Sequence, residues 1–263
     1  MLRLITIPIS HFCEKARWAL DRAGISYREE RHVQGVHVFA ARRAGGGATA
    51  PVLVTPDRVI AESGEILAWV DERTPPERRL FPADATERAE VERLCRRFDD
   101  VLGPTGRRLM YVHVLAAPEE MLAWNNQGVP HWEARAIRLA WPVAMFWAKR
   151  RLGIHPGCEP EDDAAVWREL DFVAELLEDG RPRLCGETFT AADLTFAALS
   201  ASVVLPPVYG VPLPQPEALP AALRDLVERF RQHPAGRYAL ELFTECRPDP
   251  AAPATRAPSR SSA

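Results

Sequence analysis

The sequence has almost no lysine and no closely spaced cysteine pair. Of its 33 Lys and Arg residues, only Lys15 and Lys149 are lysines. Its five cysteines are odd in number, widely scattered and never spaced as C-x-x-C, so neither a zinc site nor a disulfide framework is predicted. A reducing cytoplasm is the simplest setting for such a chain. We therefore expect a cytoplasmic protein that binds no metal.

Long apolar runs and a strong charge of one sign are also missing. No apolar run reaches the length of a transmembrane helix, and residues 1–5 enter a predicted strand at once, without the layout of a signal peptide. The net charge of −3 gives no general electrostatic case for nucleic acid or for an anionic membrane. We expect no nucleic-acid partner and no membrane span. The 263 residues are enough for two domains with cores of their own.

The first third of the chain alternates strand and helix patterns. Short apolar runs predict strands, and helical spacing of apolar residues predicts helices between them. The expected strands cover residues 2–7, 26–31, 52–54 and 59–61, and the expected helices cover residues 13–23, 38–43 and 63–72. Alternation of this kind favours a mixed sheet covered by helices.

A proline-rich linker follows, and everything after it is helical in pattern. Helices are expected over residues 86–102 and 162–178, with two more between residues 217 and 243. Thr190 and Asp193 are spaced as a capping box, and residues 194–205 carry no charge, as in a buried helix. We predict a first domain at 1–74, a linker at 75–84, a helical domain at 85–246 and a disordered tail at 247–263.

The most informative motif is the segment from Ser10 to Arg17, directly after the first strand. It places the Ser10 hydroxyl and the Cys13 thiol around the start of a helix. The amides there are unpaired and the helix dipole favours an anion. A thiolate at this point would be stabilised, whether it belongs to the protein or to a ligand.

Two further motifs follow in a fixed order. Pro51 opens an apolar strand, a position that suits a residue unable to donate to a sheet ladder, and the pair Glu62–Ser63 opens a helix. This order resembles the thioredoxin-like N-terminal domain of the cytosolic glutathione transferases. The capping box is similar to the one that precedes the buried central helix of their second domain. The resemblance implies an α/β thioredoxin-like N-terminal domain followed by an all-α C-terminal domain.

The resemblance also implies roles for single residues. Ser10 falls where serine-type classes hold their catalytic serine and omega-type classes hold a cysteine. Pro51 matches the cis-proline, and the backbone of Ala50 would pair with the cysteinyl part of glutathione. Glu62 and Ser63 match the pair that grips the glutamyl end of glutathione.

The remaining predicted site residues lie beside that serine or in the helical half. His11 and Phe12 are expected to contact the thiol ligand. By position alone, Tyr111, His113 and Trp141 are candidates for the hydrophobic substrate site.

The predicted function is that of a glutathione transferase, with glutathione as co-substrate and a hydrophobic small molecule as acceptor. The resemblance also implies a homodimer. The aromatics Trp124, Trp132, Trp141, Phe146 and Trp147 would form an apolar wall opposite Ser10; the competing account places them in the helical core or in a subunit interface.

Two alternatives stay open. Cys13 could carry a glutathione-dependent thiol transferase or reductase activity. The second alternative is a non-catalytic binding protein. Thr49 stands where many members of the family have a cationic side chain that binds the glycine carboxylate of glutathione. Arg42, Arg43 or His37 could replace that cation. The site residues also have plainer interpretations: Ser10 as a helix cap, Cys13 as a small buried residue and His11 as a loop residue.

Overall fold

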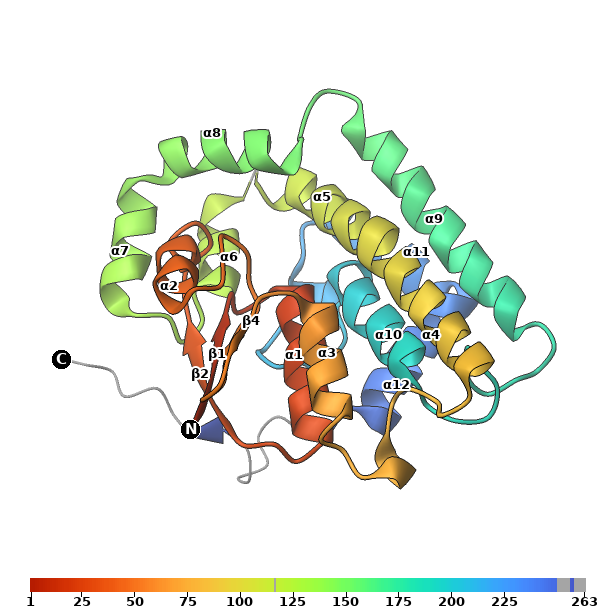
Figure 1. Cartoon of the computed structure of the whole chain (residues 1–263). Helices are drawn as coiled ribbons and strands as arrows, with labels where there is room; N and C mark the ends of the chain where they lie inside the picture. Colours follow the sequence, from red (N-terminus) through yellow and green to blue (C-terminus); the bar gives the residue numbers. More distant parts are fainter. Residues whose placement is uncertain (116, 250–255, 258–263) are drawn as a thin grey trace.

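A computed structural model describes residues 1–115, 117–249 and 256–257. Figure 1 shows a small sheet with its helices beside a larger group of helices. The elements of the first domain are β1 (Leu2–Thr6), α1 (His11–Arg22), β2 (Tyr27–Arg31), α2 (His37–Ala44), β3 (Val52–Val54), β4 (Val59–Ile60) and α3 (Ser63–Asp71). Each predicted strand and helix of this domain is therefore present, with ends shifted by one or two residues.

The sheet is mixed, as the alternating pattern predicted. Its strand order is β4-β3-β1-β2-β5, where β5 is Arg256–Ala257. β1 is parallel to β2 and antiparallel to β3, and β3 is antiparallel to β4. The apolar faces of α1 and α3 cover this sheet with fully buried side chains such as Ala16, Leu20, Ile66 and Leu67.

The second domain is helical throughout. Its helices are α4 (Ala85–Arg97), α5 (Gly103–Val114), α6 (Pro118–Asn125), α7 (His131–Leu139), α8 (Trp141–Leu152), α9 (Cys158–Leu177), α10 (Ala191–Val204), α11 (Ala221–Gln232) and α12 (Pro234–Cys246). Short 3₁₀ turns lie at Pro76–Arg78 in the linker and at Pro216–Ala218. None of the helices in the described ranges is both long enough and apolar enough to cross a bilayer.

One rod is made from α4, a π-helical turn at Phe98–Leu102 and α5 (Figure 1). The predicted helix over 86–102 thus continues to Val114. The π turn carries Asp99, whose carboxylate accepts from the fully buried Lys15 ammonium at 2.8 Å. This pair ties the rod to α1 of the first domain.

The central helix of the second domain is α10, and it starts at the predicted capping box. The Asp193 carboxylate accepts from the Thr190 amide at 2.7 Å and from the Thr190 hydroxyl at 2.9 Å. All but one of the fourteen residues of α10 are buried. The absence of charge after Asp193 is explained by this burial.

Helices α6 to α8 form a segment that arches over the end of the first domain near α2 (Figure 1). Glu133 of α7 attaches it: the buried carboxylate accepts from the Val33 amide at 2.9 Å and pairs with His32 Nδ1 at 2.7 Å. The arch is therefore held by the loop that follows β2.

The disordered tail predicted over 247–263 begins too early. Arg247 is buried, and its guanidinium pairs with Glu14 at 2.7 Å and with Asp21 at 2.9 Å. These two carboxylates hold Arg247 in the fold. The biased composition of the tail that follows gave no sign of these contacts. Arg256–Ala257 pairs in parallel with β2, and residues 250–255 and 258–263 lie outside the described residues.

Candidate active site

Strand register brings two of the predicted motifs together. In the antiparallel pair of β1 and β3, Ile5 lies opposite Val52. Continuing this register places Ala50 and Pro51 beside the turn between β1 and α1, and the Ala50–Pro51 bond is cis, as the resemblance implied. The cis-proline segment and the start of α1 therefore share one edge of the sheet.

The third motif reaches the same edge through β4. Leu53 lies opposite Ile60, so the next residues of the ladder bring Glu62 alongside Pro51. The Thr49 hydroxyl lies 3.5 Å from the Glu62 carboxylate. Glu62 is exposed and Ser63 is buried at the first position of α3.

Ser10 caps α1 and lies against the Cys13 thiol. Its Oγ accepts from the Cys13 amide at 3.4 Å, which is the capping role. Ser10 is half-buried, and its side chain also hydrogen-bonds to the Cys13 thiol. The plainer interpretation of Ser10, as a helix cap, is thus present in the structure.

Cys13 lies in the core rather than at a surface. Its side chain is fully buried, and Sγ accepts from the Ile7 amide at 3.4 Å. Burial raises the pKa of the Cys13 thiol, and the nearby Arg17 opposes this only in part. A thiol in this setting is a poor nucleophile, which argues against the thiol-transfer alternative.

His11 and Phe12 face the helical domain, not an open binding surface. His11 is buried, and its Nε2 lies 3.1 Å from the Gly103 carbonyl oxygen. Phe12 packs on the same glycine, where an added Cβ would come within 2.6 Å of the Phe12 ring. Both side chains join α1 to α5, and their contact with a thiol ligand stays a prediction.

The burial of His11 predicts a loss of stability in acid. Burial lowers the pKa of His11 from 6.5 to about 3, so its contribution is complete above pH 6.5 and falls as the pH drops toward 3. Between pH 8 and pH 5 the loss is about 2 kcal/mol from this group. Urea unfolding at both pH values should show a smaller loss in His11→Gln, whereas replacing the exposed His131 by Gln should leave the loss unchanged. Equal losses in all three proteins would contradict the assignment.

One face of α5 looks onto the first domain. Gly103, Arg107 and Tyr111 recur every four residues on this face. The buried Tyr111 hydroxyl donates to Gln34, and burial raises the pKa of Tyr111 to about 12. Tyr111 therefore lies at the junction of the two domains.

Arg107 belongs to this face and was missed by the sequence analysis. Its guanidinium lies 5.8 Å from the centre of the Phe12 ring, and its Nε is buried without a hydrogen-bond partner among the described residues. Burial lowers the pKa of Arg107, an effect to which the neighbouring Arg151 adds. The four-residue spacing from Tyr111 was the signal that could have found it.

His113 is not brought together with Tyr111. Two residues along a helix point to opposite sides, and His113 Nε2 lies 3.4 Å from Glu159 of α9. The prediction of His113 in a substrate site is therefore not supported by this geometry. Trp141 is half-buried at the first position of α8.

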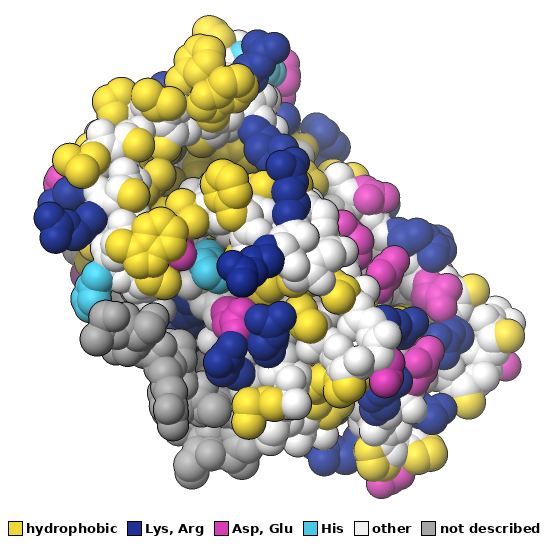
Figure 2. Space-filling model, turned by 60° about the vertical axis from the view of Figure 1, so that its left-hand side comes forward, with side chains coloured by type: hydrophobic (Ala, Val, Ile, Leu, Met, Phe, Trp, Pro, Cys, Tyr) yellow, Lys and Arg dark blue, Asp and Glu magenta, His cyan; other side chains and the backbone are white. Residues whose placement is uncertain are grey.

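The predicted aromatic wall is not enclosed. Trp132, Phe146 and Trp147 are more than half exposed, while Trp124 and Trp141 are half-buried. Figure 2 shows apolar side chains spread over this outer face. Because no residue of α8 is buried, its aromatics do not fill the helical core either.

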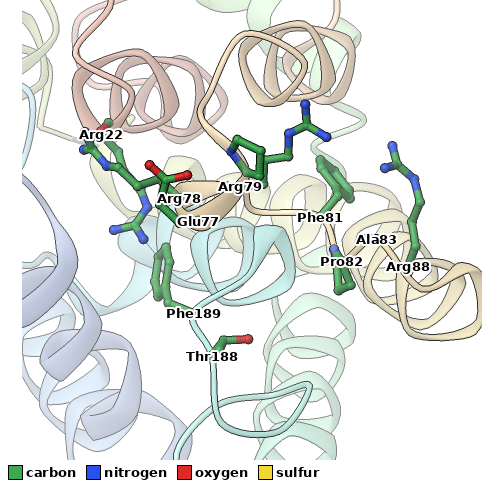
Figure 3. A pocket seen from close by; sticks show the side chains of 11 residues that line it. Arg22, Glu77, Arg78, Arg79, Phe81, Pro82, Ala83, Arg88, Thr188 and Phe189 are labelled. Carbon is green, nitrogen blue, oxygen red and sulfur yellow. Dashed lines mark hydrogen bonds between the residues drawn. The ribbon is translucent and has the colours of Figure 1, made fainter.

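A pocket of about 670 Å³ lies elsewhere, at the linker between the domains (Figure 3). Four arginines and the Phe81 and Phe189 rings are among the side chains around it. None of the predicted site residues lines it. In the ranges that the structure describes, no group of three or more His, Cys, Asp or Glu side chains is placed to hold a metal ion.

The comparisons with known proteins agree with this geometry. Residues 4–78 match the glutathione S-transferase N-terminal domain family. The first domain is a glutathione S-transferase N-terminal domain. The whole chain has the fold of the glutathione transferase superfamily, with a mixed thioredoxin-like sheet and an all-α second domain, as predicted.

Solved structures of similar fold cover both domains. A glutathione S-transferase from Xanthobacter autotrophicus Py2 is 19% identical, with a TM-score of 0.61 over 93% of each chain. Glutathione transferase F2 from Populus trichocarpa is 13% identical, with a TM-score of 0.57 over 93% of this chain and 99% of that one. A theta class enzyme from Xanthomonas axonopodis pv. citri, solved with glutathione bound, is 18% identical, with a TM-score of 0.52 over 91% and 96% of the two chains. No curated protein sequence matches the chain.

Proposed function

We propose that this protein is a glutathione transferase that joins the glutathione thiolate to a hydrophobic electrophile. The observation that carries the proposal is the place of the half-buried Ser10 hydroxyl at the first turn of α1. It lies at the sheet edge shared with the cis-proline segment and with Glu62–Ser63. A glutathione-bound theta class structure has the same fold.

Ser10 would act on the sulfur of bound glutathione. Its hydroxyl donates a hydrogen bond to the sulfur, and the unpaired amides at the start of α1 add positive potential. Both effects favour the thiolate, so the thiol proton leaves to solvent. The thiolate then attacks the electrophilic carbon, a C–S bond forms, and the leaving group departs with the electron pair of the broken bond.

Residues around Ser10 provide contacts for the rest of glutathione. The exposed Glu62 carboxylate suits the glutamyl ammonium, with the Ser63 hydroxyl beside it, and the Ala50 backbone suits the cysteinyl part. His37 is buried, and burial lowers its pKa to about 4, so it is neutral near pH 7 and a poor partner for the glycyl carboxylate. The exposed Arg42 and Arg43 at the end of α2 are the better candidates.

The electrophile would lie toward α5 and α8. The half-buried Trp141 offers apolar surface there, while the Tyr111 side chain is buried at the domain junction. Arg107 lacks a carboxylate partner in the described part of the chain and adds a positive charge near Phe12. A hydrophobic substrate with a negatively charged group fits this combination. We also propose the homodimer that is typical of the superfamily.

The alternative of a non-catalytic binding protein rests on Thr49, which is exposed and uncharged. The position of Ser10 at the start of α1, on the sheet edge shared with the cis-proline segment, favours the enzyme over that alternative. Thiol transfer by Cys13 is not proposed, since burial raises the pKa of its thiol.

Ser10→Ala tests the proposal. With glutathione and a model electrophile, the rate near pH 7 is expected to fall about 100-fold, because one preorganised donor to a developing or resident anion contributes on this scale. Glutathione binding measured by calorimetry should persist. The ultraviolet absorbance of bound thiolate should move to higher pH.

Ser10→Asp is the matched control. Aspartate caps a helix about as well as serine, so the stability of α1 is kept while the proton donor is lost. We expect a folded and inactive protein. An active Ser10→Asp protein, or an unchanged rate in Ser10→Ala, would show that Ser10 is only a cap.

A further inference from the structure

The large apolar side chains reached by solvent are concentrated on one side of the molecule. Apart from Met1 and Val59, the exposed large hydrophobic side chains of the described residues come from α2, α7 and α8. They are Phe39, Trp132, Leu139, Val143, Phe146 and Trp147, with exposed fractions from 61% to 85%. Figure 2 shows this side facing the reader. We call these six residues the α7–α8 patch. Scattered exposed apolar residues are ordinary, but a contiguous group marks an interaction surface.

The spacing of the patch residues on α8 shows that they lie on one face of that helix. Val143, Phe146 and Trp147 recur at three and four residues along α8 and so lie on one side of it. The rings of Phe146 and Trp147 meet edge to face, 5.6 Å apart. No residue of α8 is buried. This face therefore packs against nothing in the described part of the chain.

The same segment is strongly basic, although the whole chain has a net charge of −3. Residues 131–152 hold five Lys and Arg residues and a single acidic residue, Glu133. Glu133 is buried against His32, and Arg138 is paired with Glu119. The positive charge of the segment is thus exposed while its negative charge is not.

Three basic side chains adjoin the aromatic ones. Arg135 follows Trp132 by three residues, and Lys149 and Arg150 follow Phe146 by three and four, so each lies one turn from an exposed ring. Arg135, Lys149 and Arg150 are exposed and have no carboxylate partner among the described residues. Exposed rings and unpaired cations occupy the same face of the molecule.

We infer that the α7–α8 patch docks this protein on membrane surfaces that contain anionic lipids. Helices that carry Trp, Phe and Leu beside Lys and Arg lie in the plane of the bilayer interface. Tryptophan rings favour that interface, and juxtamembrane cations are drawn to anionic headgroups. The association is peripheral, in keeping with the lack of a spanning helix in the described ranges.

A second copy of the chain is a poorer occupant. A two-fold contact through this patch would place Arg135, Lys149 and Arg150 against their own counterparts, and facing like charges disfavour such a contact. An acidic protein would satisfy the charge. However, protein partners bury anchor side chains in complementary pockets, while these rings project from the outer corner of the molecule, where Leu139 is 85% exposed.

Vesicle co-sedimentation of the full chain tests the inference. Phosphatidylcholine vesicles are compared with vesicles that also contain phosphatidylglycerol, at low and at high salt. We expect binding at least tenfold stronger to the anionic vesicles at low salt, and loss of that preference at high salt, because salt screens the exposed cations.

Paired variants separate the apolar contribution from the charge. Phe146→Ser with Trp147→Ser removes two rings, and Lys149→Glu with Arg150→Glu reverses two charges; each pair should weaken binding about tenfold or more. Arg229→Glu on α11 and Val59→Ser on β4 are exposed changes outside the patch and should leave binding unchanged. Circular dichroism confirms that each variant is folded.

Light scattering on the same proteins distinguishes a membrane surface from a second copy of the chain as the occupant of the α7–α8 patch. Unchanged mass in the variants, together with their lost vesicle binding, supports the inference. A fall in mass in Phe146→Ser with Trp147→Ser, while vesicle binding remains, overturns it in favour of a second copy. Absence of binding to anionic vesicles overturns it as well, whether or not an acidic protein binds the patch instead.

Discussion

Replacing Glu14 by alanine is expected to lower the free energy of unfolding by about 3–5 kcal/mol, since removing one partner of a buried ion pair leaves an uncompensated charge. The Glu14 carboxylate is fully buried and accepts from Arg17 Nε at 2.8 Å, from Arg247 Nε at 2.7 Å and from the Gly210 amide at 3.0 Å. Burial alone would raise the pKa of Glu14, but Arg247 and Arg17 outweigh it and hold the pKa below its ordinary value. The variant therefore removes one of two carboxylate partners from each of two buried guanidinium groups, since Arg17 keeps Glu29 and Arg247 keeps Asp21.

The measurement is urea unfolding followed by circular dichroism. Glu14→Gln keeps the shape and removes the charge, so it should lose most of the same stability. Glu241→Ala, an exposed change on α12, should stay within about 0.5 kcal/mol of the parent. A Glu14→Gln protein as stable as the parent would show that packing, not charge, is what Glu14 supplies.

The same network predicts where the chain can be shortened. Arg247 follows α12 directly and joins it to Glu14 and Asp21 of α1. A chain that ends at Cys246 should therefore lose stability on the scale of Glu14→Ala, whereas a chain that ends at Asp249 should not.

Asp193→Ala should have the second large effect, a loss of about 3–4 kcal/mol, because it removes four hydrogen bonds to a fully buried carboxylate. Besides the Thr190 amide and hydroxyl, the carboxylate accepts from the Leu184 amide at 2.9 Å and from the Tyr238 hydroxyl at 2.5 Å. Asp193 thus holds the start of α10, the preceding loop and α12 together. A loss of this size corresponds to a fall in melting temperature of about 10 °C.

Two control variants separate the contribution of the Tyr238 hydrogen bond from the general effect of removing a carboxylate. Tyr238→Phe removes one donor and should cost about 1 kcal/mol. Asp179→Ala removes an exposed carboxylate paired with Arg181 and should change the melting temperature little. If Asp193→Ala melts within 3 °C of the parent protein, the capping box stabilises only the start of α10. It then does not hold α10, the preceding loop and α12 together.

Local sequence was sufficient for the first domain because its signals are short-range. The apolar runs that predicted β1 and β3 are local, and so is the position of Pro51 directly before β3. The capping pair Thr190 and Asp193 was readable because both residues lie within one helical turn. The hydrogen bond that Tyr238, 45 residues away, donates to Asp193 could not be predicted from local sequence.

The candidate site divides in the same way. Ser10, Pro51 and Glu62 were predicted from motifs, and strand register brings their segments to one edge. Arg107 was missed because an arginine on a helix looks solvated until the helix is packed against Phe12. His113 was placed with Tyr111 by nearness in sequence, which the helical period overrules.

The sequence by itself determined the order of elements in the first domain, the presence of a helix start near Ser10 and the buried character of α10. Those features depend on propensity, capping and periodicity within a few residues. Only the tertiary structure decided that Cys13 and His11 are buried, that Arg247 belongs to the core, and that the aromatics of α7 and α8 face outward. Burial and charge pairing depend on which surfaces meet, and side chains far apart in the chain set those contacts.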